Sequence, residues 1–156
     1  MHAGSSLELR VPPVAVGLIA ALCMWLLSRW TPSLAWGQYW RLATAVLLLA
    51  AGILVAVAGV LEFRRARTTV NPTTPQAASS MVRSGIYRHS RSPMYLGMLL
   101  MRAAWAAWLA NPAASAVLPG FLLFINRFQI EPEERILGRL FAGEYDAYRR
   151  SVRRWL

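Results

Sequence analysis

Two short stretches carry most of the side chains in this sequence that could do chemistry. Residues 87–95 hold tyrosine, arginine, histidine and serine directly before a long apolar run. Residues 126–134 hold two amides, an arginine and three glutamates directly after another apolar run. Arginine binds carboxylates in a forked geometry, and glutamate accepts hydrogen bonds from ammonium and hydroxyl groups. Together these residue types suit the binding of a small, polar, charged molecule.

Each of these groups also has a plainer interpretation. The arginines and tyrosines of residues 87–95 could be interfacial anchors and part of an aromatic belt. Glu133 and Glu134 could complement a helix dipole after Pro132. His89 has no second histidine nearby and Ser90 has no paired base. Metal binding and Ser/His catalysis are therefore disfavoured, and no metal is expected.

The elements that position these stretches are predicted to lie in a membrane. Of the 156 residues, 56% are hydrophobic and only 7 are Asp or Glu, whereas a soluble domain of this size is normally more polar. Residues 42–61 carry no charge over about 20 positions, the length needed to cross a bilayer as a helix. We expect a single all-α domain over residues 1–156.

Four transmembrane helices are predicted. They lie at residues 13–29, 41–62, 95–110 and 112–128. The first lacks a charged leading region, so it is interpreted as a retained span rather than a secretory signal. Asn111 and Pro112 predict a tight turn that makes the last two spans a helical hairpin. The hairpin would bring residues 87–95 and 126–134 to one membrane face.

The arginines predict the orientation of this bundle. Most lie in the loop at residues 63–94 or in the tail at residues 129–156, which places both termini in the cytoplasm, with a bacterial inner membrane as the expected location. The net charge of +10 then faces anionic lipid, and no nucleic-acid partner is expected. The tail is expected to be helical and amphipathic, with a first helix that ends at Gly143 and a second apolar stripe that continues from Tyr145 to Trp155.

Two single residues within the predicted spans also call for an interpretation. Cys23 is the only cysteine, so no disulfide framework is expected, and it is predicted to fill space within its span. Arg102 is costly in lipid, so it is expected to face the bundle interior or to snorkel.

The order of the motifs resembles the isoprenylcysteine carboxyl methyltransferase and phospholipid methyltransferase family of integral membrane enzymes. The matching pieces are TTVNP at residues 68–72, GIYRHSRSPMYLG at 85–97, NRFQIEPEERIL at 126–137 and FAGEYDAYRRSVRRWL at 141–156. The resemblance covers residues 64–156. It implies a small bundle of transmembrane helices whose cytoplasmic segments close over S-adenosylmethionine.

The resemblance also implies which residues form the site. Arg91 and Glu134 are the expected catalytic pair. The expected cofactor-binding residues are Tyr87, Arg91, Ser92, Pro93, Tyr95, Gly97, Asn126, Glu133, Glu134, Tyr145 and Tyr148. Many family members have histidine where this chain has Ser92, so only a shorter hydroxyl is available for hydrogen bonding there.

The expected activity is S-adenosylmethionine-dependent methyl transfer to a lipophilic or amphipathic acceptor in the membrane. An isoprenylcysteine carboxylate, a lipid amine and a small thiol all remain open as the acceptor. The alternative is a non-enzymatic membrane module that binds anionic lipid or a partner through its arginine-rich cytoplasmic face. An NADPH-dependent reductase is a third possibility, disfavoured because few arginines are present to bind the phosphates of a dinucleotide.

Overall fold

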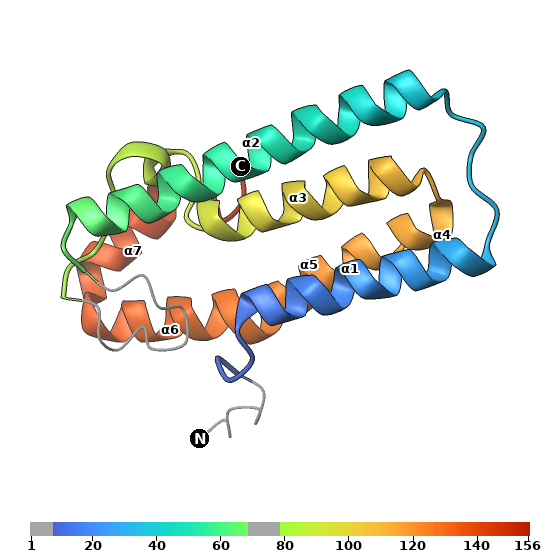
Figure 1. Ribbon diagram of the computed structural model, residues 1–156. Coiled ribbons are helices and arrows are strands. Elements are labelled where there is room, and N and C mark those ends of the chain that lie inside the picture. The colour runs from blue at the N-terminus through green and yellow to red at the C-terminus, as the bar shows by residue number, and fades with distance from the viewer. Residues whose placement is uncertain (1–7, 69–78) are drawn as a thin grey trace.

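A computed structural model describes residues 8–68 and 79–156, and the regular structure in these ranges is helical. Figure 1 shows two layers, with α2 and α3 in one and α1, α4 and α5 in the other. The helices are α1 (Pro13–Trp30), α2 (Gln38–Arg65), η2 (Gly85–Arg88), α3 (Pro93–Leu109), α4 (Pro112–Ser115), α5 (Val117–Ile125), η3 (Asn126–Ile130), α6 (Glu131–Leu140) and α7 (Ala142–Ser151). In the TTVNP motif, residues 69–72 lie outside the described ranges.

The turn between α3 and α4 confirms the predicted hairpin. Ala110 ends α3 in the left-handed conformation, with φ of 47°. The Asn111 side chain caps α4 by accepting a hydrogen bond from the Ala114 amide, and its Nδ2 donates to the Thr31 carbonyl at 3.0 Å. Pro112 then opens α4, where its missing N–H costs nothing. Asn111 therefore joins the hairpin tip to the end of α1.

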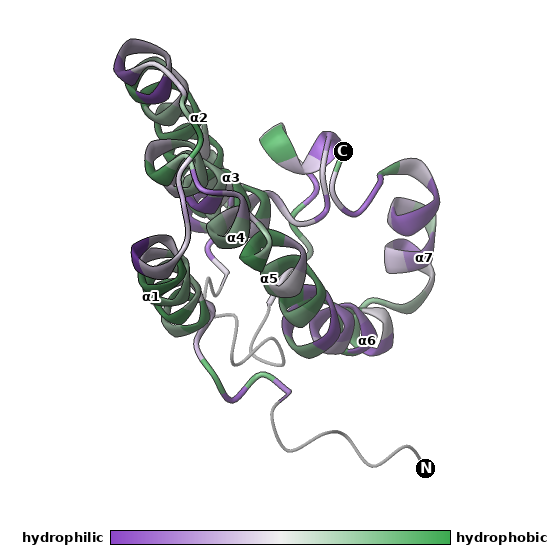
Figure 2. Ribbon diagram, turned by 90° about the vertical axis from the view of Figure 1, so that its right-hand side faces the viewer, coloured by the Kyte–Doolittle hydropathy of each residue, from purple (hydrophilic) through white to green (hydrophobic). Residues whose placement is uncertain are grey.

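Three helical stretches in the described part of the chain are long and apolar enough to cross a membrane. They are Pro13–Trp30, Gln38–Arg65 and Pro112–Leu140. The remaining predicted span corresponds to α3, which has 17 residues. Figure 2 shows apolar residues along α1, α2, α3 and α5, whereas α6 and α7 are more polar.

Helices α2 and α3 approach each other closely at two glycines. A Cβ atom built on Gly97 would lie 2.6 Å from the Gly52 carbonyl oxygen, and one built on Gly52 would lie 2.8 Å from the Gly97 carbonyl oxygen. Real Cβ atoms essentially never come within 3.0 Å of such an atom. Small residues let membrane helices pack backbone against backbone. This contact fixes α3, and with it Tyr95 in its first turn, against α2.

The helix does not end at residue 128, where the fourth span was predicted to meet the tail. The chain stays helical from α5 through the π-helical segment η3 into α6. Pro132 explains the wide turn, because proline lacks an N–H and its ring conflicts with the carbonyl four residues earlier. The Glu131 amide instead donates to the Asn126 carbonyl, five residues back. Glu133 and Glu134 therefore lie within a continuous helix and not at a free helix N-terminus.

Two predictions about single residues in the tail and the first span are also wrong. The helix before the tail turn ends at Leu140, not at Gly143, which lies inside α7. Cys23 is exposed on α1 and does not fill space within the bundle. The reason is helical periodicity: α1 buries Gly17 and Met24 on one face, and Cys23 lies off that face.

Candidate active site

The short helix η2 is held in place by a buried carboxylate at the end of α2. Glu62 accepts hydrogen bonds from the Ser84 hydroxyl and, at 2.6 Å, from Arg65. Gly85 lies directly over this carboxyl group with φ of +56°. Tyr87, two residues later, is buried and packs edge-on against Phe63, with ring centroids 5.5 Å apart. The position of Tyr87 therefore depends on the contact between Glu62 and η2.

Replacing Gly85 with alanine is expected to destabilise this loop. The new Cβ would lie 2.5 Å from the Glu62 carboxyl carbon, and the positive φ is strained for any residue with a side chain. We expect a loss of about 1–3 kcal/mol, measured as a lower midpoint of thermal unfolding in detergent. Gly143→Ala is the control, because no atom lies within 4 Å of its Cβ position. Equal midpoints for the two variants would contradict the role of Gly85.

Two arginines converge on Glu134 at the base of the hairpin. Arg154 donates to both oxygens of the Glu134 carboxylate, at 2.7 and 3.3 Å. Arg91 Nη1 lies 3.3 Å from the same carboxylate. Arg91 and Glu134 are nearly buried, with side chains 10% and 12% exposed. One carboxylate thus lies within ion-pair distance of two guanidinium groups.

Arg91 retains hydrogen-bonding capacity that the described part of the protein does not use. Its Nε and Nη1 atoms are buried and have no hydrogen-bond partner there, because the approach of Nη1 to Glu134 is too poorly aligned for a hydrogen bond. A buried donor without a partner is costly. The Arg91 guanidinium is therefore suited to bind an additional acceptor, such as a carboxylate oxygen.

The C-terminal segment holds the loop that carries Arg91. The Arg91 amide donates to the Arg153 carbonyl at 3.0 Å, and the Ser90 hydroxyl donates to the Arg154 carbonyl at 3.1 Å. These bonds bring the last residues of the chain beside the start of α3, as Figure 1 shows for the C-terminus. The same segment supplies the Arg154 side chain to Glu134.

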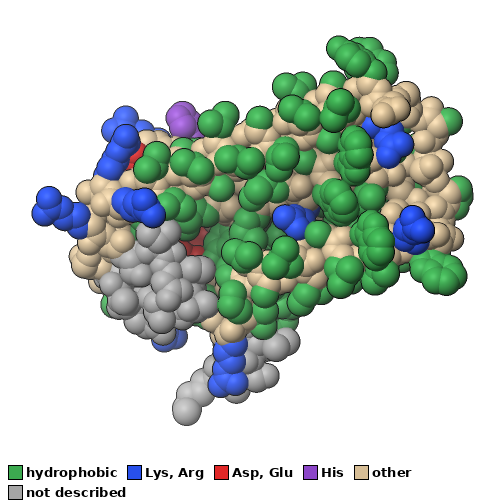
Figure 3. Space-filling view, in the orientation of Figure 1, with side chains coloured by type: hydrophobic (Ala, Val, Ile, Leu, Met, Phe, Trp, Pro, Cys, Tyr) green, Lys and Arg blue, Asp and Glu red, His purple; other side chains and the backbone are tan. Residues whose placement is uncertain are grey.

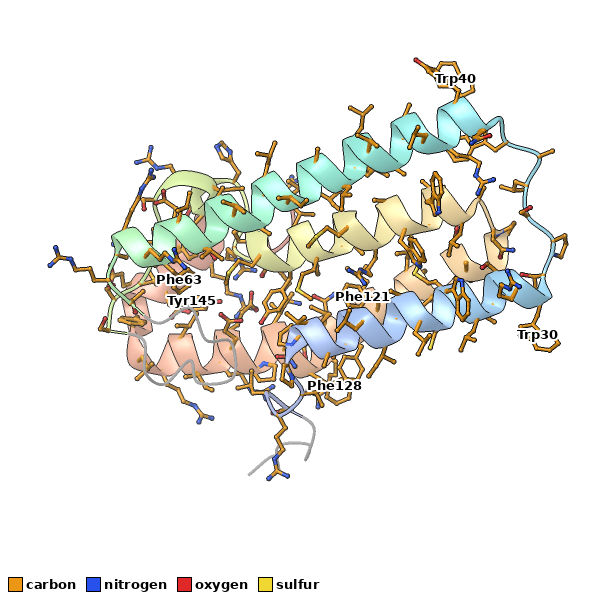
Figure 4. The ribbon with its side chains drawn as sticks, in the orientation of Figure 1. Trp30, Trp40, Phe63, Phe121, Phe128 and Tyr145 are labelled. Atoms are coloured by element: carbon orange, nitrogen blue, oxygen red, sulfur yellow. The ribbon has the colours of Figure 1, made fainter. Side chains whose placement is uncertain are left out.

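Tyrosines form a second part of the site. The Tyr95 hydroxyl donates to Glu133 at 3.1 Å, so α3 and α6 are joined beside the Arg91–Glu134 pair. Tyr148 is buried, and its hydroxyl donates to the Tyr87 carbonyl at 2.6 Å. Tyr145 packs edge-on against Tyr148, with ring centroids 6.4 Å apart. Figure 4 shows Tyr145 at the same end of the molecule as Phe63.

Burial keeps these phenols neutral. It raises the pKa of Tyr145 to about 12, and the nearby Glu134 charge acts in the same direction. Burial also raises the pKa of Tyr148 and that of Tyr87. Hydrogen bonding to Glu134 raises the pKa of Arg154, which stays a cation. The site thus presents neutral aromatic rings and hydroxyl groups beside charged guanidinium and carboxylate groups.

Four of the predicted site residues lie apart from these polar contacts. Gly97 faces Gly52 and Ala56 of α2. Asn126 accepts a hydrogen bond from the Trp155 indole at 3.2 Å. Ser92 and Pro93 are buried at the start of α3. The contacts of these four residues hold α3 and the C-terminal segment in place.

Three residues that the sequence analysis did not select contribute to the site. Arg154 is the strongest partner of Glu134, and Trp155 joins the C-terminus to Asn126. Glu62 fixes η2. Glu62 has a sequence signal, since it is the acidic residue directly after a charge-free apolar run. Arg154 is one of four arginines between residues 149 and 154, and nothing in their spacing separates it from the others.

The family match and one of the similar proteins both name a methyltransferase. Residues 40–144 match the model of the phospholipid methyltransferase family. An uncharacterised protein of Haemophilus influenzae is 48% identical over 63 residues, which is 40% of this chain and 100% of that protein. Protein-S-isoprenylcysteine O-methyltransferase A of Arabidopsis thaliana is 25% identical over 119 residues, 74% of this chain. The chain spans only 59% of the length of this plant enzyme.

No solved structure shows a significant match to the chain. The family match nevertheless covers well over half of the sequence and includes α2, η2, α3 and α6, the elements that carry Glu62, Tyr87, Tyr95, Glu133 and Glu134. Together with apolar helices long enough to cross a bilayer, it indicates a membrane methyltransferase. The chain is a member of the phospholipid methyltransferase family.

Proposed function

We propose that this protein is an S-adenosylmethionine-dependent methyltransferase that methylates a lipophilic or amphipathic acceptor in the membrane. The observation that carries the proposal is the Arg91 guanidinium, which is buried at the base of the hairpin with two atoms that have no hydrogen-bond partner in the described structure. A protein that used Arg91 only as an interfacial anchor would leave its charge in water.

The residues present match the chemical groups of S-adenosylmethionine. Its amino-acid carboxylate suits the free donors of Arg91. Its ammonium and ribose hydroxyl groups suit Glu133, whose carboxylate accepts a hydrogen bond from Tyr95 and can accept others. Its sulfonium cation suits the face of a neutral buried tyrosine such as Tyr145. Arginine, glutamate and tyrosine thus each have a partner on this cofactor.

The chain's own residues orient the reactants and exclude water. When bound, S-adenosylmethionine supplies the electrophilic methyl group, and transfer to the acceptor is a displacement that depends on alignment. Glu134 is bound by two arginines, so we assign it the role of holding Arg91 in place. Glu133 is the better candidate for taking a proton if the acceptor is an amine. A carboxylate acceptor is already ionised and needs no base.

The proposed orientation in the membrane places this site on the cytoplasmic side. Arginines gather at the left-hand end of the molecule in Figure 3, where α2 ends. Trp30 and Trp40 lie at the opposite end in Figure 4, with exposures of 87% and 63%, as expected for an interfacial aromatic belt. The 17 residues of α3 span about 25 Å, enough to make α3 the fourth crossing.

Calorimetric binding of S-adenosylmethionine, and of its demethylated product, tests the proposal on detergent-purified protein. We expect binding in the micromolar range by the parent protein and a loss of about 10- to 100-fold in Arg91→Gln, the equivalent of one charge-assisted hydrogen bond. Arg91→Gln leaves the Glu134–Arg154 pair intact, so the fold is expected to survive. Arg88→Gln is the matched control, because Arg88 is an exposed arginine of the adjoining η2.

Two outcomes would overturn the proposal. One is the absence of binding by the parent protein in several lipid-supplemented detergents, which would favour the non-enzymatic membrane module. The other is equal weakening by Arg88→Gln and Arg91→Gln, which would show that general positive charge, and not the buried site, attracts the ligand.

A further inference from the structure

A groove on the side of the bundle, here called the Arg102 groove, combines an apolar lining with one partly buried cation. It has a volume of about 530 Å³, within the range of small-molecule pockets. It is lined by one residue of α1, four of α2 and five of α3, namely Ala21, Leu42, Ala45, Val46, Leu49, Met101, Arg102, Ala104, Trp105 and Trp108. Arg102 is the only charged residue among them.

Arg102 is incompletely satisfied in this position. Its Nη1 donates to the Gly17 carbonyl of α1 at 2.7 Å. Its Nε is buried and has no hydrogen-bond partner in the described structure, and no described carboxylate forms an ion pair with Arg102. A guanidinium within an apolar bundle is costly unless its charge is compensated. One neutral carbonyl group does not compensate it.

The groove is open at the outer surface of the bundle, and its lining residues on α3 lie beyond Tyr95, away from the candidate active site. Figure 3 shows mostly apolar side chains on the face between α2 above and α1 below, the elements that line the groove together with α3. Arg102 is seven residues beyond Tyr95 on α3, or about 10 Å along the helix. Trp108 lies further along in the same direction.

We propose that the Arg102 groove binds the methyl acceptor, and that this acceptor is an anionic amphiphile whose charged oxygen pairs with Arg102. Its hydrocarbon chain extends past Trp105 towards Trp108, and its methyl-accepting group reaches from Arg102 towards Tyr95 and Glu133. An anion is favoured over a neutral polar group because only an anion neutralises this partly buried charge. Describing the occupant as the acceptor rests on the proposed function, whereas its binding to Arg102 does not.

Protection of an introduced thiol measures occupancy without any methyl transfer. Cys23→Ala removes the single cysteine, and Val46→Cys places a thiol in the wall of the groove. The rate of its alkylation by a small maleimide is followed in a neutral maltoside detergent. Four probes with the same hexadecyl chain length are added separately: a carboxylate, a phosphate monoester, an alcohol and a trimethylammonium.

We expect the carboxylate or the phosphate to slow alkylation at least fivefold at a concentration where the alcohol and the ammonium have no effect. Comparison of the two anionic probes identifies which oxyanion the groove prefers. Arg102→Gln removes the charge but retains a donor for the Gly17 carbonyl, and it should abolish the protection. Arg102→Lys keeps the charge and should retain most of it.

Equal protection by all four probes, or protection that survives Arg102→Gln, would overturn the inference and leave Arg102 as a tie between α1 and α3. The two proposals can fail separately. If the anionic probes protect but S-adenosylmethionine does not bind, the groove stands and the methyltransferase proposal falls. If S-adenosylmethionine binds and no anionic probe protects, the methyltransferase proposal stands and the groove proposal falls.

Discussion

Glu134→Gln is expected to lower the free energy of unfolding by about 3 kcal/mol, even though the substitution changes only one polar atom. Glu134 is the counter-ion of both Arg91 and Arg154. Without its charge, two guanidinium groups would face each other in a nearly buried site, with side chains 10% and 27% exposed. The midpoint of thermal unfolding in detergent should fall by roughly 5–10 °C.

Glu144→Gln is the control for this measurement. Glu144 also pairs with an arginine, Arg83, but both side chains are about half exposed. An exposed pair contributes less than about 1 kcal/mol, so the midpoint should scarcely change. Limited proteolysis gives a second readout, because the C-terminal segment should be cleaved faster only in Glu134→Gln. A shift for Glu144→Gln as large as that for Glu134→Gln would contradict the central role of Glu134.

Gly97→Val is expected to disrupt the packing of α2 on α3. Its Cβ would lie 2.6 Å from the Gly52 carbonyl oxygen and 2.8 Å from the Ala56 Cβ. Neither atom is the end of a flexible side chain, so the two helices must move apart. Overpacking at a tight contact costs about 1–3 kcal/mol, and loss of the adjacent helix–helix contacts adds to this value. The measurement is again the unfolding midpoint in detergent.

The same variant tests whether the α2–α3 contact also positions the site. Tyr95 lies two residues before Gly97, so displacement of α3 should weaken S-adenosylmethionine binding as well as stability. Gly120→Val is the matched control in α5, since no atom lies within 4 Å of its Cβ position. If Gly97→Val binds the cofactor as tightly as Gly120→Val, Tyr95 does not depend on this helix contact.

The helical class and the hairpin could be predicted from the sequence because both depend on local signals. A charge-free run such as residues 42–61 can satisfy its backbone in a membrane only as a helix. Pro13, Pro93 and Pro112 are placed where a helix can begin, and each occupies the first turn of a helix in the structure. The arginine, tyrosine and glutamate types of the candidate site were likewise visible as motifs.

The sequence did not determine that the last span continues into α6, or that α6 ends at Leu140. The π-helical segment depends on how the chain accommodates Pro132, which can either end or distort a helix. The exposure of Cys23 depends on which face of α1 meets the bundle, and the face chosen is the one that carries Gly17 and Met24.

Only the tertiary structure decided which charges pair and which glycines matter for packing. Arg154 is one of several arginines in the tail, and it contacts Glu134 because residues 153–154 hydrogen-bond to the loop before α3. Gly97 ends the sequence stretch GIYRHSRSPMYLG, yet it faces Gly52 on a helix far away in the sequence. The sequence shows residue types and local periodicity directly. Ion pairs and close helix contacts instead form between segments that are far apart in the sequence and meet only in the folded protein.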